Sequence, residues 1–325
     1  HTRFKCDWSS DVCSSDLRAI MRGSFNACFA TGSQLCGHRE ICLLPLSHVF
    51  GLIYSTMGAL YTGALWFSAE DMKATIGKLP QIKPTKLVLV PGLCEILLGL
   101  VRMYGPQFLG GQLKIVISGA ANVPPKLIKE FDEIGVNLLF GYGMTEGANL
   151  TTGNADVHEK PTAVGKVFPE QEVKIVDGEL WFKGDNVFLG YYGNEEATKA
   201  VMHDGYYHTG DTAWKDEDGF YWFVGRVDDV IKSSGYRIGP FEIESVIMEL
   251  PYVLECGVSA APDEVRGQVV KASIVLVKGK EGTEELKKEI QNYVKSHTAP
   301  YKYPRIVVFR DSLHKTISGK IQRNL

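Results

Sequence analysis

The stretch LKIVISGAANVPPKLIKEFDEIG, residues 113–135, contains the strand-then-helix pattern that decides the fold. A short apolar, β-rich run is followed by small residues and then by a helical pattern, which two prolines open and Gly135 closes. The run KLVLVP, residues 86–91, precedes a second helical pattern over 93–104. Strands that alternate with helices form parallel sheets with crossover helices. We therefore predict α/β layers for this part of the chain.

Downstream of residue 162 the pattern changes to hairpins. Asp177-Gly178 and Asp218-Gly219 each lie between two alternating runs, which is typical of tight β-turns. We predict a small antiparallel β-rich subdomain over 162–226. Together with the α/β layers it would make a partial large N-terminal domain over 18–226.

A third pattern begins near Asp228. We expect a helix over 242–248, a strand over 269–277 and an amphipathic helix over 283–297. These elements predict a small α+β C-terminal domain over 227–325.

Composition and charge are those of an ordinary soluble protein. The 325 residues are 45% apolar and 22% charged, and the formal net charge is -3, so nothing favours nucleic acid or an anionic membrane as a partner. Seven cysteines without a C-x-x-C pair argue against a disulfide framework and a structural zinc site. The most apolar stretch, 51–67, is interrupted by polar residues and glycines, so we expect no membrane span. We expect a cytoplasmic protein.

The first 17 residues differ from the rest. DWSSDVCSSDL, residues 7–17, reads like the translation of a common sequencing-library adapter, so we take residues 1–17 as a non-native segment and exclude them from the fold prediction.

Two stretches follow predicted strands and could bind a ligand. In SGAANVPP, residues 118–125, small residues would let a flat ligand approach the backbone, although a plain connection explains them too. In LLFGYGMTEG, residues 138–147, Tyr142 offers an aromatic face, and Glu146 suits a magnesium–nucleotide role. A solvated turn is the alternative.

Three further stretches carry charge at informative places. In YHTGD, Asp211 can accept hydrogen bonds from two vicinal hydroxyls such as those of a ribose, or it is a plain turn residue. VGRVDDVIKSSGYRIGPFEIE, residues 224–244, suits a hinge next to an anionic ligand, or a solvated linker. KTISGKIQR, residues 315–323, carries lysines near the end of the chain. Such a positive charge could neutralise the negative charge that develops in a transition state, or it could simply keep the chain soluble.

Taken in order, these stretches resemble the adenylate-forming superfamily, which includes acyl-CoA synthetases and peptide-synthetase adenylation domains. The resemblance begins at about residue 40 and also covers LPLSHVFG and GELWFKGDNVFLGYY. It implies a reaction in which a carboxylate attacks the α-phosphate of ATP to give an acyl-adenylate and pyrophosphate. The thiol of coenzyme A then displaces AMP.

The resemblance also implies roles for individual residues. Lys320 would be the catalytic lysine of the C-terminal loop, Thr145 would contact phosphate, Glu146 would hold Mg²⁺, and the small mobile domain would rotate about Asp228. His48 would border the acyl pocket, with a structural histidine as the alternative. The nucleotide-binding residues would be Gly119, Ala120, Ala121, Tyr142, Gly143, Met144, Thr145, Asp211, Phe223, Arg226 and Arg237.

The C-terminal part is most similar to medium-chain acyl-CoA synthetases, through SSGYRIGPFEIE, VRGQVVKA and TAPYKYPR. That similarity implies a fatty acid substrate and a set of coenzyme A contacts, whose basic groups would suit the phosphates of that ligand. The set comprises Ser234, Gly235, Tyr236, Arg266, Lys295, Tyr303, Pro304 and Arg305.

The sequence differs from the pattern of the family in two ways. The family's Ser/Thr/Gly-rich loop, which wraps the β- and γ-phosphates of ATP, is absent from this sequence, so we expect a fragment that does not adenylate by itself. The part before about residue 202 resembles a different branch of acyl-CoA ligases from the part after Tyr206. An enzyme that loads a carrier protein, and a non-catalytic remnant that binds AMP or coenzyme A, are the alternatives.

Overall fold

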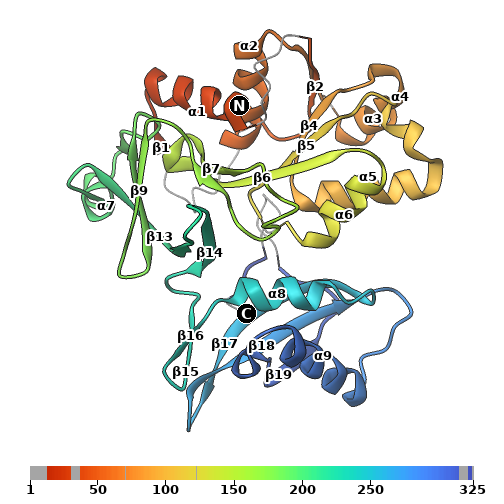
Figure 1. The fold of residues 1–325 in the computed structure, drawn as a ribbon, viewed down its shortest axis with the longest axis vertical. Helices are drawn as coiled ribbons and strands as arrows, with labels where there is room; N and C mark the ends of the chain where they lie inside the picture. The colour runs from red at the N-terminus through yellow and green to blue at the C-terminus, as the bar shows by residue number, and fades with distance from the viewer. Residues whose placement is uncertain (1–12, 31–36, 70, 122, 315–320, 324–325) are drawn as a thin grey trace, which may run out of the picture.

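The fold is that of a computed structural model, which describes residues 13–30, 37–69, 71–121, 123–314 and 321–323. Figure 1 shows two lobes, a large one that holds the first part of the chain and a smaller one formed by the last part. No helix within these ranges is long and apolar enough to cross a bilayer.

A seven-stranded sheet organises the large lobe. Its order is β3-β2-β4-β5-β6-β7-β8. The first five strands in this order are parallel to one another, β7 is antiparallel to β6, and β8 is antiparallel to β7. This arrangement confirms the predicted parallel layers. The strands are β2 (Arg39–Cys42), β3 (Leu65–Ser68), β4 (Lys86–Leu89), β5 (Ile115–Ser118), β6 (Asn137–Met144), β7 (Asn149–Asn154) and β8 (Lys166–Val167).

Helices cover this sheet, with α1 and α2 on one side and α5 and α6 on the other (Figure 1). The two predicted helices are confirmed as α5 (Pro91–Tyr104) and α6 (Pro125–Glu133), and both begin at a proline. After α6 the chain turns at Gly135, whose φ of 72° a side chain would resist. The other helical elements of this lobe are α1 (Leu17–Ala30), the π-helix η1 (Phe50–Met57), α2 (Gly58–Thr62), α3 (Met72–Gly77), α4 (Leu79–Ile82), η2 (Pro106–Leu109) and η3 (Thr145–Gly147).

The predicted β-rich subdomain is an antiparallel sheet of order β12-β13-β10-β9, with β14 paired to β13. Asp177 and Gly178 both have positive φ, 53° and 88°, as a two-residue hairpin turn requires. Tyr207 of β13 is buried in this unit, but Trp214 on the same strand is half exposed, so the aromatic residues around YHTGD are not all core. The elements are β9 (Gln171–Val176), β10 (Glu179–Gly184), α7 (Glu195–Val201), β12 (Met202–His203), β13 (Tyr206–Lys215) and β14 (Tyr221–Arg226).

The end of the adapter-like segment takes part in the fold. β1 (Cys13–Ser14) pairs with β11 (Gly190–Tyr191), and the Asp16 carboxylate accepts a hydrogen bond from the backbone N–H of Ala19 at the start of α1. The strand pairing requires only two residues in an extended conformation, and the cap requires only a carboxylate.

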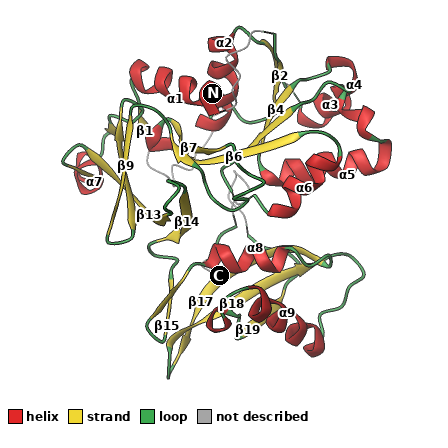
Figure 2. Ribbon diagram, viewed as in Figure 1, coloured by secondary structure: helices red, strands yellow, loops and turns green. Residues whose placement is uncertain are grey.

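The small lobe is a mixed five-stranded sheet covered by two helices (Figure 2), of which α8 lies on the side of the large lobe. Thr283 is the N-cap of α9 and its side chain accepts a hydrogen bond from the backbone N–H of Leu286. The helix buries Leu286, Ile290 and Val294, as its apolar spacing predicts. The elements are β15 (Ile231–Ser233), β16 (Tyr236–Ile238), α8 (Pro240–Met248), β17 (Val253–Asp263), β18 (Gly267–Leu276), α9 (Glu284–His297), η4 (Pro300–Lys302) and β19 (Ile306–Phe309).

Candidate active site

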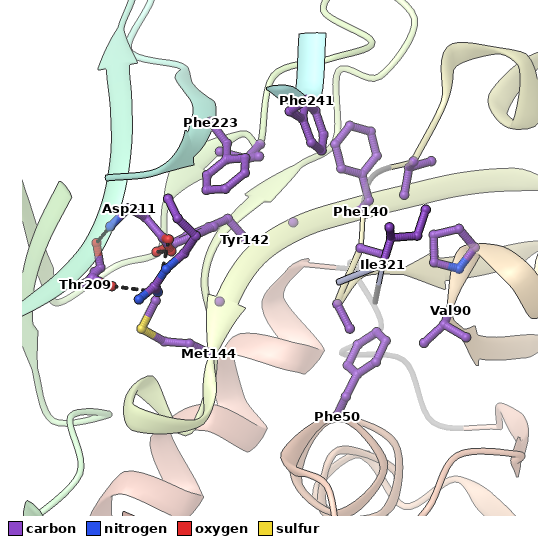
Figure 3. A pocket seen from close by; sticks show the side chains of 18 of the residues that line it. Phe50, Val90, Phe140, Tyr142, Met144, Thr209, Asp211, Phe223, Phe241 and Ile321 are labelled. Atoms are coloured by element: carbon purple, nitrogen blue, oxygen red, sulfur yellow. Dashed lines mark hydrogen bonds and ion pairs between the residues drawn. The ribbon is translucent and has the colours of Figure 1, made fainter. Parts of the chain in front are cut away.

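A cavity of about 970 Å³ is lined by residues of both lobes. Strand β6, helix η3 and strands β13 and β14 supply one wall, whereas α8, β17, Ile321 and Arg323 supply the other. Figure 3 shows Thr209 and Asp211 at one end, Phe50, Val90, Phe140 and Ile321 at the other, and Tyr142 between them. The cavity therefore has a polar end and an apolar end.

Asp211 is the buried carboxylate of the polar end, with only 5% of its surface exposed. Its Oδ2 accepts a hydrogen bond of 2.6 Å from the Tyr142 hydroxyl. Its Oδ1 lies 3.3 Å from Nη1 of Arg226, which is directly opposite on β14 in the sheet register. Nη1 of Arg226 also donates to the carbonyl of Thr209 at 3.1 Å. Pairing of this kind is what allows a carboxylate to remain buried.

The surroundings of Asp211 keep Tyr142 and Arg226 protonated. Burial, and then the charge of Asp211, raise the pKa of Tyr142 well above its usual value, so the phenol stays a hydrogen-bond donor. Burial is the largest single effect and lowers the pKa of Arg226, but the charge of Asp211, the neighbouring Tyr142 and Tyr207 and the hydrogen bond to Asp211 together raise it overall. Tyr142 and Arg226 thus orient the Asp211 carboxylate in the cavity wall.

An aromatic wall stands beside this carboxylate. The ring of Tyr142 stacks on Phe223 with centroids 5.9 Å apart and an interplanar angle of 29°. Phe241 of α8 meets Phe223 edge-on at 5.5 Å, so the wall continues from the large lobe into the small one. Such a wall suits a flat aromatic ligand.

Glu146 of η3 also faces the cavity. Its Oε1 accepts a 2.9 Å hydrogen bond from the Tyr191 hydroxyl, and burial together with this carboxylate helps to raise the pKa of Tyr191 to about 12. Among the described residues no group of three His, Cys, Asp or Glu side chains could hold a metal alone. One carboxylate suits Mg²⁺, which usually takes one or two protein carboxylates and completes its shell with water and phosphate oxygens.

Arg323 fastens the last described residues to the small lobe. Its guanidinium donates to both oxygens of Glu244, each at 2.8 Å, and to Oδ2 of Asp229 at 3.1 Å. Glu244 is buried and also accepts from the backbone N–H of Val258 at 2.8 Å. This bidentate pairing gives a defined geometry to a segment that otherwise has little secondary structure.

Most of the predicted nucleotide and acyl residues share this one cavity. Gly119 lies behind it, where a side chain would come within 3.3 Å of the Phe50 ring. Arg237 is exposed on β16 beside the Gly178 turn, and Asp228 is exposed in the turn that follows β14. Lys320 is outside the described residues. Those that line the cavity are His48, Ala120, Ala121, Tyr142, Gly143, Met144, Thr145, Glu146, Asp211, Phe223 and Arg226.

The residues expected to contact coenzyme A do not line the cavity but gather on the small lobe. The backbone N–H of Ser234 donates to the carbonyl of Arg266 at 3.1 Å, and both Ser234 and Gly235 have positive φ. Tyr236 stacks on Tyr301 with centroids 4.1 Å apart, which connects this turn to the η4 segment.

The η4 side of this surface is basic and aromatic. Lys295 Nζ lies 4.0 Å from the centroid of the Tyr303 ring, and Arg305 Nη1 donates to the Tyr303 hydroxyl at 2.7 Å. Arg266 Nη1 lies 3.7 Å from Oδ1 of Asp263. The backbone hydrogen bond from Arg266 lowers the pKa of this carboxyl, burial opposes the shift, and the backbone N–H of Val265 and the charges of Arg266 and Arg305 lower the pKa further.

Sequence reasoning missed several cavity residues. Glu179 accepts from the backbone N–H of Gly210 at 2.8 Å and so holds the turn before Asp211. Tyr191 of β11 and Phe241 of α8 also line the cavity. Ile321 and Arg323 lie in KTISGKIQR, one and three positions after Lys320, to which alone the resemblance assigns a role.

Comparison with known families gives two matches. The model of the AMP-binding enzyme family matches residues 16–192, and that of the AMP-binding enzyme C-terminal domain matches residues 242–320. The first match alone covers more than half of the chain.

Individual relatives agree with these matches. The mitochondrial acyl-coenzyme A synthetase ACSM3 of Mus musculus is 41% identical over 231 residues, which are 65% of this chain and 40% of the relative. The 4-hydroxybutyrate–CoA ligase 1 of Metallosphaera sedula is 36% identical over 284 residues, 82% of this chain and 50% of that protein.

A solved structure resembles the whole described fold. The o-succinylbenzoate coenzyme A synthetase MenE of Bacillus subtilis, in complex with ATP and magnesium ion, superposes with a TM-score of 0.82 at 26% identity and covers 97% of this chain and 66% of its own. The chain spans about 40 to 50% of the length of the two curated relatives. The chain belongs to the family of AMP-binding enzymes.

Proposed function

We propose that this chain serves an AMP-forming carboxylic acid:coenzyme A ligase. In the first step a carboxylate oxygen bonds to the α-phosphorus of ATP and pyrophosphate leaves, which gives an acyl-adenylate. In the second step the sulfur of coenzyme A bonds to the acyl carbon, AMP leaves, and the thiol proton is released. This chain would contribute the adenylate cavity and the coenzyme A surface.

The position of Asp211 is the observation that carries the proposal. It is buried in the cavity wall, oriented by Tyr142 and Arg226, and shares the cavity with Glu146. An acceptor-only group at the floor of a cavity suits a ligand with two neighbouring hydroxyls, which a ribose provides.

The other parts of an adenylate find matching chemistry. The Tyr142–Phe223 wall suits the adenine ring. Thr145 on η3 lines the cavity, and its hydroxyl would contact a phosphate oxygen. Glu146 would hold Mg²⁺, which supplies charge neutralisation of the phosphates when bound. Lys320 would approach from the small lobe and meet the negative charge that develops during transfer.

Coenzyme A would lie on the small lobe, with its phosphates near Arg266, Lys295 and Arg305. Lys295 and Arg305 lie against Tyr303, Tyr236 stacks on Tyr301, and cationic and aromatic groups together suit a phosphorylated adenosine. Rotation about Asp228 would bring this surface to the cavity for the second step. The carboxylic acid substrate would be aliphatic. The protein's location in the cytoplasm stays a prediction.

The second step offers the direct experiment, because it does not use the β- and γ-phosphates of ATP. The purified chain is mixed with a preformed fatty acyl-adenylate and coenzyme A, and acyl-CoA and AMP are quantified by chromatography. We expect both products to form together, faster than without protein. Tight binding of AMP with no acyl-CoA above the uncatalysed rate would contradict the ligase proposal and favour a non-catalytic adenylate-binding protein.

A further inference from the structure

The cavity continues beyond the Asp211 region into an apolar end. Phe50 and Phe140 are buried members of the main core cluster, and Val90 packs against that cluster. All three line the cavity. Figure 3 shows their side chains together at the end opposite Asp211. On the large lobe these three side chains form an apolar wall, and His48 and Glu95 line the cavity as polar residues.

Ile321 faces this wall from the small lobe. It lines the same cavity, and Figure 3 shows it among Phe50, Val90 and Phe140. Phe241 of α8 is also drawn beside Phe140 in this view, and both small-lobe residues line the cavity. Apolar side chains of the small lobe thus face the apolar wall of the large lobe, and Ile321 is the one drawn among Phe50, Val90 and Phe140.

The backbone around Ile321 is held in place by the small lobe. A methyl group on Gly257 of β17 would lie 3.0 Å from Cγ2 of Ile321, so the side chain packs directly on that backbone. The next residue, Gln322, donates its N–H to the carbonyl of His314 at 2.9 Å. Arg323 then binds Glu244 and Asp229. Ile321 is therefore presented on a fixed support.

We propose that Ile321 is a specificity-determining residue that caps the hydrocarbon chain of the acyl group. The inference rests on the proposed function and deepens it. With the ribose at Asp211, the acyl chain of an adenylate would extend toward Phe50, Val90 and Phe140, and Ile321 covers its exposed side. Acids with several methylene groups gain from this cap, since burial of each methylene strengthens binding roughly fourfold. An acetyl group has no methylene to bury there.

The test uses calorimetric titration of the 325-residue chain with AMP, acetyl-sulfamoyladenosine and hexanoyl-sulfamoyladenosine. For Ile321→Ala we expect the affinity for the hexanoyl compound to fall by roughly five- to tenfold, because part of the apolar contact is lost. The affinities for AMP and for the acetyl compound stay within about twofold of the unaltered chain. Retained AMP binding also shows that the variant is folded.

Two further variants sharpen the test. Ile321→Leu keeps the volume and should retain the hexanoyl affinity within about twofold. Ile306→Ala makes the same change on β19, at a partly exposed residue that does not line the cavity, and should leave all three affinities unchanged.

The outcomes separate two kinds of failure. An equal loss for AMP and for the hexanoyl compound, or no loss for either, would overturn the role of Ile321 and leave the ligase proposal standing. Failure of the unaltered chain to bind any of the three adenosine compounds would instead overturn the proposed function itself.

Discussion

Tyr142 and Asp211 form the most consequential pair of side chains in the molecule. A buried carboxylate loses its hydration, and this one regains hydrogen bonds from a phenol at 2.6 Å and a guanidinium at 3.3 Å. Since Tyr142 is fixed on β6 of the central sheet and Arg226 on β14 next to β13, Asp211 is oriented before any ligand arrives. Preorganisation of this kind lowers the entropic cost of binding.

Removal of the Tyr142 hydroxyl tests this orientation. In Tyr142→Phe the stack on Phe223 is preserved, whereas the Asp211 carboxylate loses one buried donor. We expect the free energy of unfolding to fall by about 1–2 kcal/mol and the affinity for AMP to fall roughly fivefold. Urea unfolding and calorimetric titration measure the two effects.

Tyr252 provides a matched control. Its hydroxyl also donates to a carboxylate, that of Glu289, at 2.7 Å, but the contact is exposed to solvent. Tyr252→Phe should change the unfolding free energy by no more than about 0.5 kcal/mol and leave AMP affinity unaltered. Equal effects of the two substitutions would contradict a special role for the buried pair.

At the scale of elements, the central sheet contains a buried ion pair between adjacent strands. Glu40 of β2 lies opposite Lys86 of β4, with Nζ 3.1 Å from Oε2, and both side chains are at most 2% exposed. The ammonium also lies 5.6 Å from the ring of Tyr54 in the π-helix η1. Burial raises the pKa of Glu40 more than Lys86 lowers it. Desolvation is therefore the larger effect here.

This balance predicts a strong asymmetry between single and double substitutions. Lys86→Met should lower the free energy of unfolding by about 3–5 kcal/mol, because it leaves a buried carboxylate without its cation. Glu40→Leu combined with Lys86→Met should recover most of that loss. Chemical denaturation measures both. A double variant as unstable as Lys86→Met would show that the pair itself, rather than the avoided unpaired charge, supports the sheet.

The β13–β14 hairpin carries a pH-sensitive contact at its turn. Although partial burial opposes the shift, hydrogen bonds from Lys160, Phe220 and Trp222 lower the pKa of Asp216 from 3.8 to about 2. A group whose pKa is lowered on folding contributes stability above its unfolded pKa and loses it as the pH falls through the folded value. Asp216→Asn should therefore lower Tm at neutral pH, with a difference that shrinks between pH 4 and pH 2. Thermal unfolding across that range would contradict the account if the difference were constant.

At the scale of the whole molecule, Arg323 connects the last described residues to the small lobe. Arg323→Met removes the bonds to Glu244 and Asp229 and leaves the buried Glu244 without its cation. We expect a loss of about 3 kcal/mol in the stability of the small lobe and faster tryptic cleavage after Lys320. Limited proteolysis followed by mass spectrometry measures the cleavage rate. An unchanged rate would contradict the anchoring role.

Much of this organisation follows from local sequence patterns. Proline-opened helices, Asp-Gly turns and the apolar spacing of α9 predict their elements, because each depends on residues close together in the chain. The motifs also identify Asp211 and Tyr142 as candidate ligand residues. Their hydrogen bond joins residues 69 positions apart and depends on the packing of two sheets, so it could not be read from local pattern.

Other features depend on tertiary packing in the same way. The pairing of Glu40 with Lys86 requires the register between β2 and β4. Trp214 is half exposed because it lies near the exposed end of β13, where its ring stacks on Trp222 of β14. The place of Ile321 in the cavity depends on the contact between the lobes. None of these has a signal in residue spacing alone.

One measurement tests the central claim, that Asp211 binds the sugar of an adenosine nucleotide. The affinities for AMP and 2′,3′-dideoxy-AMP are measured by calorimetry in the unaltered chain and in Asp211→Ala. We predict that the substitution weakens AMP binding about tenfold or more but changes the affinity for the dideoxy compound by less than about twofold, a coupling of roughly 1–3 kcal/mol. An equal loss for both ligands would show that Asp211 does not contact the ribose hydroxyls.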